Sequence, residues 1–262
     1  MPDITVTTLV VLCLAAGAAG WIDAVVGGGG LLLLPALLLG LPHVPAAHIL
    51  GTNKAVAIVG TSGAAVTYAR KAPVRVGTAL RIGLAALAGS MTGAFFAAGI
   101  SSDVLRPVIM VVLLAVAAFV MLRPRFGRTA QEGTAPRVTR ARTVTAIVLV
   151  GGGIGLYDGL FGPGTGTFLV LALTAVLHLN LVTASATAKI VNVCTNAGAL
   201  AMFAYQGNVM WQLAGLMAVF NLAGGLMGAR MALSRGSGFV RGVLLVVVFS
   251  LVAKLAFDQW NG

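Results

Sequence analysis

The chain has 262 residues, of which 59% are hydrophobic and 9% charged, and its mean hydropathy is +1.02. Soluble globular domains contain about 25% charged residues. The composition therefore excludes a soluble enzyme, a disordered protein and a nucleic-acid binder. At roughly 20 apolar residues per span, a chain of this length holds roughly eight to ten membrane segments. We predict an all-α polytopic membrane protein that crosses the bilayer several times.

The net charge of +11 comes from basic residues that gather in a few polar loops. In a membrane protein such loops face the cytoplasm, because of the positive-inside rule. The largest group lies in the polar stretch 123–142, which we expect to be a cytoplasmic linker. Its arginines are Arg123, Arg125, Arg128, Arg137, Arg140 and Arg142.

The first apolar segment resembles a signal peptide in its small residues, but it contains Asp3 and lacks a basic amino-terminal region. We therefore expect an uncleaved helix whose amino terminus is outside. Further apolar segments follow in chain order. The predicted segments are 4–26, 29–41, 46–69, 77–100 and 104–122, then 143–161, 165–179, 186–205, 210–230 and 240–257.

An internal repeat organises these segments. Residues 17–94 align without gaps on 152–229, after a shift of 135 positions, and rare intramembrane charges fall in register. Asp23 aligns with Asp158 and Lys54 with Lys189. We predict a duplication, with a first repeat at 1–122, the linker at 123–142 and a second repeat at 143–262.

Basic residues also predict the orientation of the repeats. The loop with Arg70, Lys71 and Arg75 is expected in the cytoplasm, whereas its equivalent, 205–209, is uncharged and is expected outside. Equivalent loops on opposite sides indicate inverted topology. The short segments 29–41 and 165–179 are typical of broken or re-entrant helices.

Each aspartate precedes a glycine-rich break in an apolar segment. The first break contains Gly27 and Gly29, and the second contains Gly162 and Gly164. A charge at the bilayer centre costs about 2.5–3.5 kcal/mol, so it needs a partner, water or a function. A broken helix also exposes backbone N–H groups that attract anions. The sequence predicts an anion site near the midplane, with Asp23 and Asp158 as proton carriers or as partners of the lysines.

Lys54 and Lys189 have three interpretations. They coordinate an anion together with Thr52, Asn53 and Thr187, they neutralise the aspartates of either half, or they extend to the membrane surface. On the same helix as Lys189, the side chains of Asn192 and Asn196 share one face. These two asparagines either bind the substrate or hydrogen-bond between helices.

Trp21 through Gly30, followed by Gly51-Thr52-Asn53-Lys54, resembles the sulfite exporter TauE/SafE family. The second-half sequence from Tyr157 to Gly166, followed by Ala188-Lys189, strengthens the resemblance. It implies a permease of the prokaryotic plasma (inner) membrane that moves sulfite or organosulfonates. The first half departs from the pattern, because it has no Pro-Gly at its break.

These observations predict a secondary transporter of small sulfur-containing anions that works by alternating access and is coupled to an ion, with protons co-transported or exchanged. The alternatives are an anion channel, a carrier of another small anion such as a carboxylate, and a membrane scaffold or enzyme subunit. We expect no enzymatic activity, because the sequence has no set of nucleophile, base and orienting residue and no metal-ligand spacing. The expected partners are the small anion and the lipid bilayer, with no cofactor, no metal and no nucleic acid. The sequence leaves the oligomeric state open.

Overall fold

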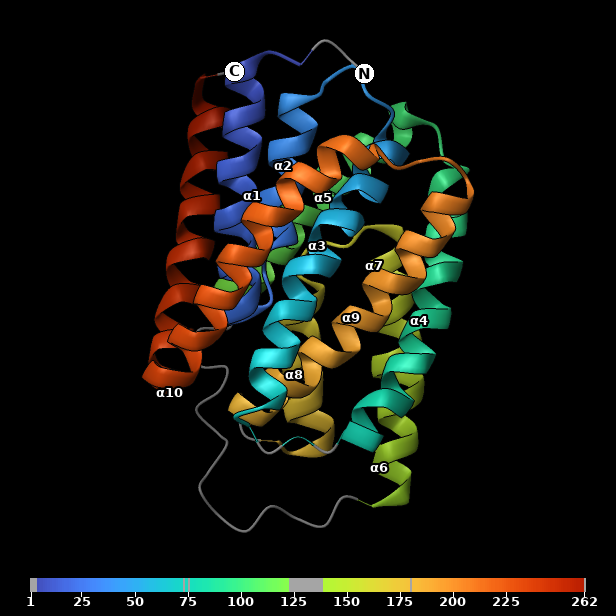
Figure 1. Ribbon diagram of the computed structural model, residues 1–262, viewed down its shortest axis with the longest axis vertical. Helices are drawn as coiled ribbons and strands as arrows, with labels where there is room; N and C mark the ends of the chain where they lie inside the picture. Colours follow the sequence, from blue (N-terminus) through green and yellow to red (C-terminus); the bar gives the residue numbers. More distant parts are fainter. Residues whose placement is uncertain (1–3, 73, 75, 123–138, 180, 262) are drawn as a thin grey trace.

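The computed structural model describes residues 4–72, 74, 76–122, 139–179 and 181–261, and these residues form helices without any strand (Figure 1). The first half contains five helices, and the second half begins with a helix that has three parts. The elements are α1 Val6–Val26, α2 Gly30–Gly40, α3 Ala46–Ala69, α4 Val76–Ala98, α5 Ser102–Leu122, α6 Arg140–Thr145, the π-helical segment η1 Ala146–Gly153, α7 Ile154–Leu160, α8 Thr165–Leu177, α9 Leu181–Tyr205 and α10 Trp211–Asn261.

Within the described residues, five helical stretches are long and apolar enough to cross a bilayer. These are Val6–Val26, Ala46–Ala69, Val76–Ala98, Arg140–Leu160 and Trp211–Arg235. Large apolar side chains on the outer helices, such as Phe95, Phe96 and Val111, are exposed, as a lipid-facing surface requires. The predicted fold class, an all-helical multi-pass membrane protein, is confirmed.

The helices α2 and α8 have only 11 and 13 residues, which is too short to cross a bilayer. α2 turns back along α1, because Gly40 at its end lies against Leu12 and Thr8 near the start of α1. Leu34 and Leu37 of α2 are fully buried. In the second half, α8 contacts α7, η1 and α6 in the same way. Each half therefore opens with a helical hairpin whose turn, at the glycine-rich break, lies inside the molecule.

Glycines bring helices of different halves into close contact. A Cβ atom on Gly224 of α10 would lie 2.0 Å from the carbonyl oxygen of Gly17 in α1. A Cβ atom on Gly89 of α4 would lie 2.6 Å from the carbonyl oxygen of Gly152 in η1. The shift of 135 residues relates the two contacts, since Gly17 is equivalent to Gly152 and Gly89 to Gly224. In each contact the first helix of one half packs on the fourth helix of the other.

One region differs from the sequence analysis, and another lies mostly outside the described residues. The segments predicted at 210–230 and 240–257 belong to one helix, α10, which changes direction in Figure 1 so that its last part runs beside α1. Most of the predicted linker 123–142 lies outside the described residues. Its described end begins α6, where the side chain of Thr139 accepts a hydrogen bond from the backbone N–H of Arg142.

Candidate functional site

The helix breaks of the two halves touch each other inside the molecule. Gly27, at φ +77°, ends α1, and a Cβ atom there would lie 2.3 Å from the carbonyl carbon of Gly166. In the first turn of α8, the backbone N–H of Thr167 donates to the Gly27 carbonyl at 3.2 Å, and its hydroxyl donates to the Val26 carbonyl at 2.9 Å. Only glycine fits at this contact. This close approach of backbones explains Gly27 and Gly166, whereas a Cβ atom on Gly29 would meet Asp23 and Ala19, and Gly162 has a positive φ of its own.

Two helices begin at this contact, and their first residues line a common cavity. α2 begins at Gly30 and α8 at Thr165, and both residues line the cavity. Neither of these two helix starts is capped by a side chain of its N-cap residue, which is Gly29 in α2 and Gly164 in α8. Helix starts carry N–H groups and a partial positive charge that favour an anion. Here the N–H groups of Leu31, Leu32 and Thr167 already donate to the carbonyls of Gly28, Gly29 and Gly27, so the attraction rests on the first N–H groups and on the partial charge.

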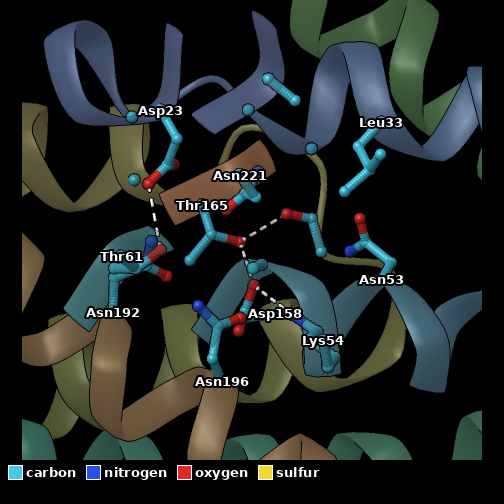
Figure 2. Close-up of a pocket in the computed structure, with 17 residues that line it drawn as sticks. Asp23, Leu33, Asn53, Lys54, Thr61, Asp158, Thr165, Asn192, Asn196 and Asn221 are labelled. Carbon is cyan, nitrogen blue, oxygen red and sulfur yellow. Dashed lines mark hydrogen bonds and ion pairs between the residues drawn. The ribbon is translucent and has the colours of Figure 1, made fainter. Parts of the chain in front are cut away.

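One ion pair lies in the wall of the cavity (Figure 2). The ammonium group of Lys54 in α3 is 2.7 Å from Oδ1 of Asp158 in α7, and each side chain is only 2% exposed. The hydroxyl of Thr165 donates to the same oxygen at 2.6 Å. The other carboxylate oxygen, Oδ2, is buried and has no hydrogen-bond partner among the described residues. The pair is therefore incompletely satisfied on the side of the aspartate.

A second ion pair joins Lys189 of α9 to Asp23 of α1. The ammonium group is 2.8 Å from Oδ2 of Asp23, and it also donates to the backbone carbonyl of Asp23. The hydroxyl of Thr61 donates to Oδ2 at 3.1 Å, as Figure 2 shows. Asp23 lines the cavity with a side chain that is 16% exposed, whereas Lys189 is 2% exposed and does not line it.

Both ion pairs connect the two halves. Lys54 of the first half binds Asp158 of the second, and Lys189 of the second half binds Asp23 of the first. Of the interpretations that the sequence left open, neutralisation by the opposite half is therefore realised in this structure. The four formal charges cancel, which keeps the buried group neutral overall.

The cavity collects most of the residues that the sequence singled out. Its predicted members come from α1, the first break, α3, α7, the second break and α9. They are Asp23, Gly27, Gly29, Asn53, Lys54, Asp158, Gly162, Asn192 and Asn196.

Four predicted residues lie elsewhere, and each has another contact. The hydroxyl of Thr52 accepts a hydrogen bond from the backbone N–H of Met210 at 3.1 Å. The hydroxyl of Thr187 donates to the Thr183 carbonyl at 2.7 Å. Gly164 adopts φ +74° at the start of α8 and faces Val116. Lys189, the fourth, lies behind Asp23.

Sequence reasoning missed several residues of the cavity wall. Thr61 and Thr165 hydrogen-bond the two carboxylates, and Leu33 contributes an apolar side chain. Asn221 of α10 lines the cavity and donates from Nδ2 to the Ala16 carbonyl at 2.8 Å. The sequence did hold a signal for Asn221, because it is a polar residue within an apolar segment and such a side chain needs a partner inside a membrane.

The chemical groups at the cavity are of the kinds that bind a polar or charged ligand. Within the part of the chain that the structure describes, no group of three or more His, Cys, Asp or Glu residues could hold a metal ion. The cavity offers one ammonium group, two carboxylates, several amides and two helix starts. These groups define a multi-pass membrane protein with a buried polar site between two repeated halves.

Comparisons with known proteins identify the family. The sulfite exporter TauE/SafE family matches residues 12–255. The chain is 34% identical to "Probable membrane transporter protein ORF9" of Sinorhizobium sp, over 98% of this chain and 96% of that protein. It is also 34% identical to "Probable membrane transporter protein YfcA" of Escherichia coli (strain K12), over 95% of this chain and 90% of that protein. A "Probable membrane transporter protein" of Haemophilus influenzae is 31% identical over 98% of both chains.

The chain belongs to the sulfite exporter TauE/SafE family and is a membrane transporter. The resemblance found in the two glycine-rich motifs is confirmed. No solved structure matches the chain.

Proposed function

We propose that the protein is a secondary transporter of small sulfur-containing anions, of the sulfite or organosulfonate type. The observation that carries the proposal is the meeting of two helix starts, at Gly30 and Thr165, with the ammonium group of Lys54 around one cavity. These groups attract an oxyanion from three directions. Sulfite and the sulfonate group are compact and present several oxygens that accept hydrogen bonds. The family name supports this class of anion.

In this proposal Lys54 contacts the anion directly, because it lines the cavity. The amides of Asn53, Asn192 and Asn196 and the backbone at the glycine breaks donate further hydrogen bonds. Lys189 acts through Asp23, since it lies behind that carboxylate. Thr52 and Thr187 would support their helices rather than the anion.

The transport mechanism that we propose is alternating access, with inverted repeats that move against each other around the site. Two observations support it. The loop after α3, with Arg70 and Lys71, lies at the end of the molecule where α6 begins, and the equivalent loop between α9 and α10 lies at the opposite end (Figure 1). The glycine contacts between the halves also occur in equivalent pairs. Such repeats let a site open first to one side and then to the other.

Counterflow in proteoliposomes tests the proposal. Vesicles are loaded with unlabelled sulfite or methanesulfonate, and the uptake of the labelled anion is followed. We expect saturable exchange that thiosulfate and sulfoacetate inhibit, and that K54M abolishes. Exchange of acetate but of neither sulfur anion would contradict the substrate class. Linear, non-saturating flux of sulfite would favour a channel over a carrier.

The location that we propose is the plasma membrane of a prokaryote, since the relatives named above come from bacteria. Net uptake by cells that express the protein, measured with labelled sulfite, would test both location and direction. Retention of the tagged protein in the soluble fraction would contradict this location.

A further inference from the structure

The carboxylate of Asp158 is only half satisfied by hydrogen bonds. Its Oδ1 atom receives Lys54 and Thr165, whereas Oδ2 is buried beside the cavity without a partner among the described residues. A buried acceptor without a donor is costly. Oδ2 is therefore an open position for a hydrogen-bond donor, a cation or a proton.

The net charge of the site limits what can bind at Oδ2 of Asp158 during transport. With Lys54, Asp158, Lys189 and Asp23 charged, the site is neutral before an anion binds. A bound monovalent anion would leave one uncompensated negative charge in the membrane interior. The site returns to neutrality when one carboxylate becomes neutral at the same time. The anion then takes the place of that carboxylate beside a lysine.

Asp158 fits this role better than Asp23. Its partner Lys54 lines the cavity and so can pass directly from the carboxylate to the anion. Lys189 does not line the cavity and stays bound to the backbone carbonyl of Asp23, whatever the charge of the Asp23 side chain. The side chain of Asp23 is 16% exposed and that of Asp158 is 2% exposed, so water can solvate the charge of Asp23 when an anion binds.

A proton suits Oδ2 better than a metal cation does. The ammonium group of Lys54 already lies 2.7 Å from Oδ1, so a sodium ion on the same carboxylate would meet a nearby like charge. The other charged or titratable groups around the cavity are few. Asp23 faces it from α1, Lys189 lies behind Asp23 on α9, and Tyr157, next to Asp158 on α7, donates its hydroxyl to the Pro163 carbonyl. The groups from α3, α8 and α10 at the cavity, apart from Lys54, are neutral.

We infer that Asp158 carries the coupling proton and that one proton moves with each monovalent anion. This inference rests on the proposed function. Protonation at Oδ2 releases Lys54, and the anion binds the released ammonium group. Since each ligand favours the binding of the other, neither crosses alone. The loaded and the empty site are both neutral, so transport of a monovalent anion is electroneutral.

Methanesulfonate is a suitable probe, because its charge is constant across the physiological pH range. In wild-type proteoliposomes, an inside-alkaline pH gradient should concentrate labelled methanesulfonate about tenfold for each pH unit, as one proton per anion requires. A potassium diffusion potential of either sign should leave this uptake unchanged. A dye inside the vesicles should report one proton entering per anion.

The variant D158N separates coupling from transport. Asparagine is permanently neutral, so the loaded site keeps its charge balance and exchange of methanesulfonate should persist. Net uptake should be lost, because the empty site would cross the membrane with a surplus positive charge. The matched control is D103N, which changes an exposed carboxylate in the first turn of α5, far along the chain from the cavity residues. D103N should show the uptake of the wild type.

Several results would overturn the inference. One is that D158N retains uptake driven by the pH gradient. The others concern the wild type: uptake driven by a membrane potential, accumulation that follows a sodium gradient, or uptake of the anion without entry of protons. If D158N does not fold, the dye measurement on the wild type decides. Absence of methanesulfonate counterflow in the wild type also overturns the inference, and counterflow of labelled sulfite then tells whether the proposed function falls with it.

Discussion

The two ion pairs occupy equivalent positions in the two halves, yet their surroundings differ. Among the described residues, the ammonium group of Lys54 has one acceptor, Oδ1 of Asp158, and Lys54 lines the cavity. Lys189 has two acceptors on Asp23, the side chain and the backbone carbonyl, and lies outside the cavity wall. The two pairs recur in the sequence after 135 residues, and their surroundings fit the roles proposed above, in which one pair exchanges partners and the other holds helices together.

The largest expected effect follows from removing the lysine of the exchanging pair. K54M leaves the buried carboxylate of Asp158 without its counter-ion, and truncation of one partner of a buried charge pair costs about 3–5 kcal/mol. We expect lower thermal stability in detergent and a loss of counterflow of about 100-fold or more. The double variant K54M/D158N should regain stability but not transport, because no charge is then left unpaired. Restored transport in the double variant would mean that Lys54 only neutralises Asp158.

A smaller effect on transport is expected for the other pair. K189M should lower the thermal stability by about the same amount as K54M, since Asp23 also loses its counter-ion. The apparent affinity for the anion should change less, because Lys189 does not line the cavity. Competition binding on K189M and K54M side by side measures the difference. Equal losses of affinity in both variants would contradict the division of roles.

The close contact between the two helix breaks can be tested by a substitution of Gly27. G27A places a Cβ atom 2.3 Å from the Gly166 carbonyl carbon and strains a backbone at φ +77°. G207A is the matched control, because Gly207 has φ +74° and a Cβ atom there would have open space within 4 Å. Left-handed backbone costs an L-residue about 1–2 kcal/mol, and overpacking adds about 1–3 kcal/mol. G27A should therefore lower the stability more than G207A in thermal unfolding, and equal losses would argue against a tight contact.

Much of this arrangement could be predicted from the sequence. Aspartates and lysines that recur in register after 135 residues identified the charged groups, and the glycines after each aspartate identified the helix breaks. Such residues are rare in membranes unless they have a role, so their signal is strong. The short helices α2 and α8 follow from the length of their apolar segments.

Other features were missed, some although helix geometry in the sequence held the signal, and others because they depend on tertiary packing. Thr52 and Thr187 each precede a lysine by two positions, and on a helix two residues are about 200° apart, so these hydroxyls point away from the cavity. Asn192 and Asn196, which lie four positions apart, both line the cavity from one face of α9, as expected. The choice of partner for each lysine depends on tertiary packing between the halves. Asn221 has Ala86 as its equivalent, so the repeat gave no sign of it.

The smallest effect concerns a residue outside the site that holds one of the two hairpins in place. The guanidinium group of Arg106 in α5 donates to the carbonyls of Leu38, Leu41 and Val44, where α2 ends and the chain turns toward α3. R106A removes these donors, and we expect a loss of about 1–3 kcal/mol, the usual cost of leaving buried acceptors unpaired. R106K keeps the charge but not the planar set of donors, so it should recover only part of the stability. Because Arg106 touches the end of α2 and not its start, the affinity for the anion should remain close to that of the wild type in binding assays below the unfolding temperature. A large loss of affinity in R106A would mean that the whole of α2 moves when its far end is released, and that the hairpin of the first half is a moving part rather than a fixed wall.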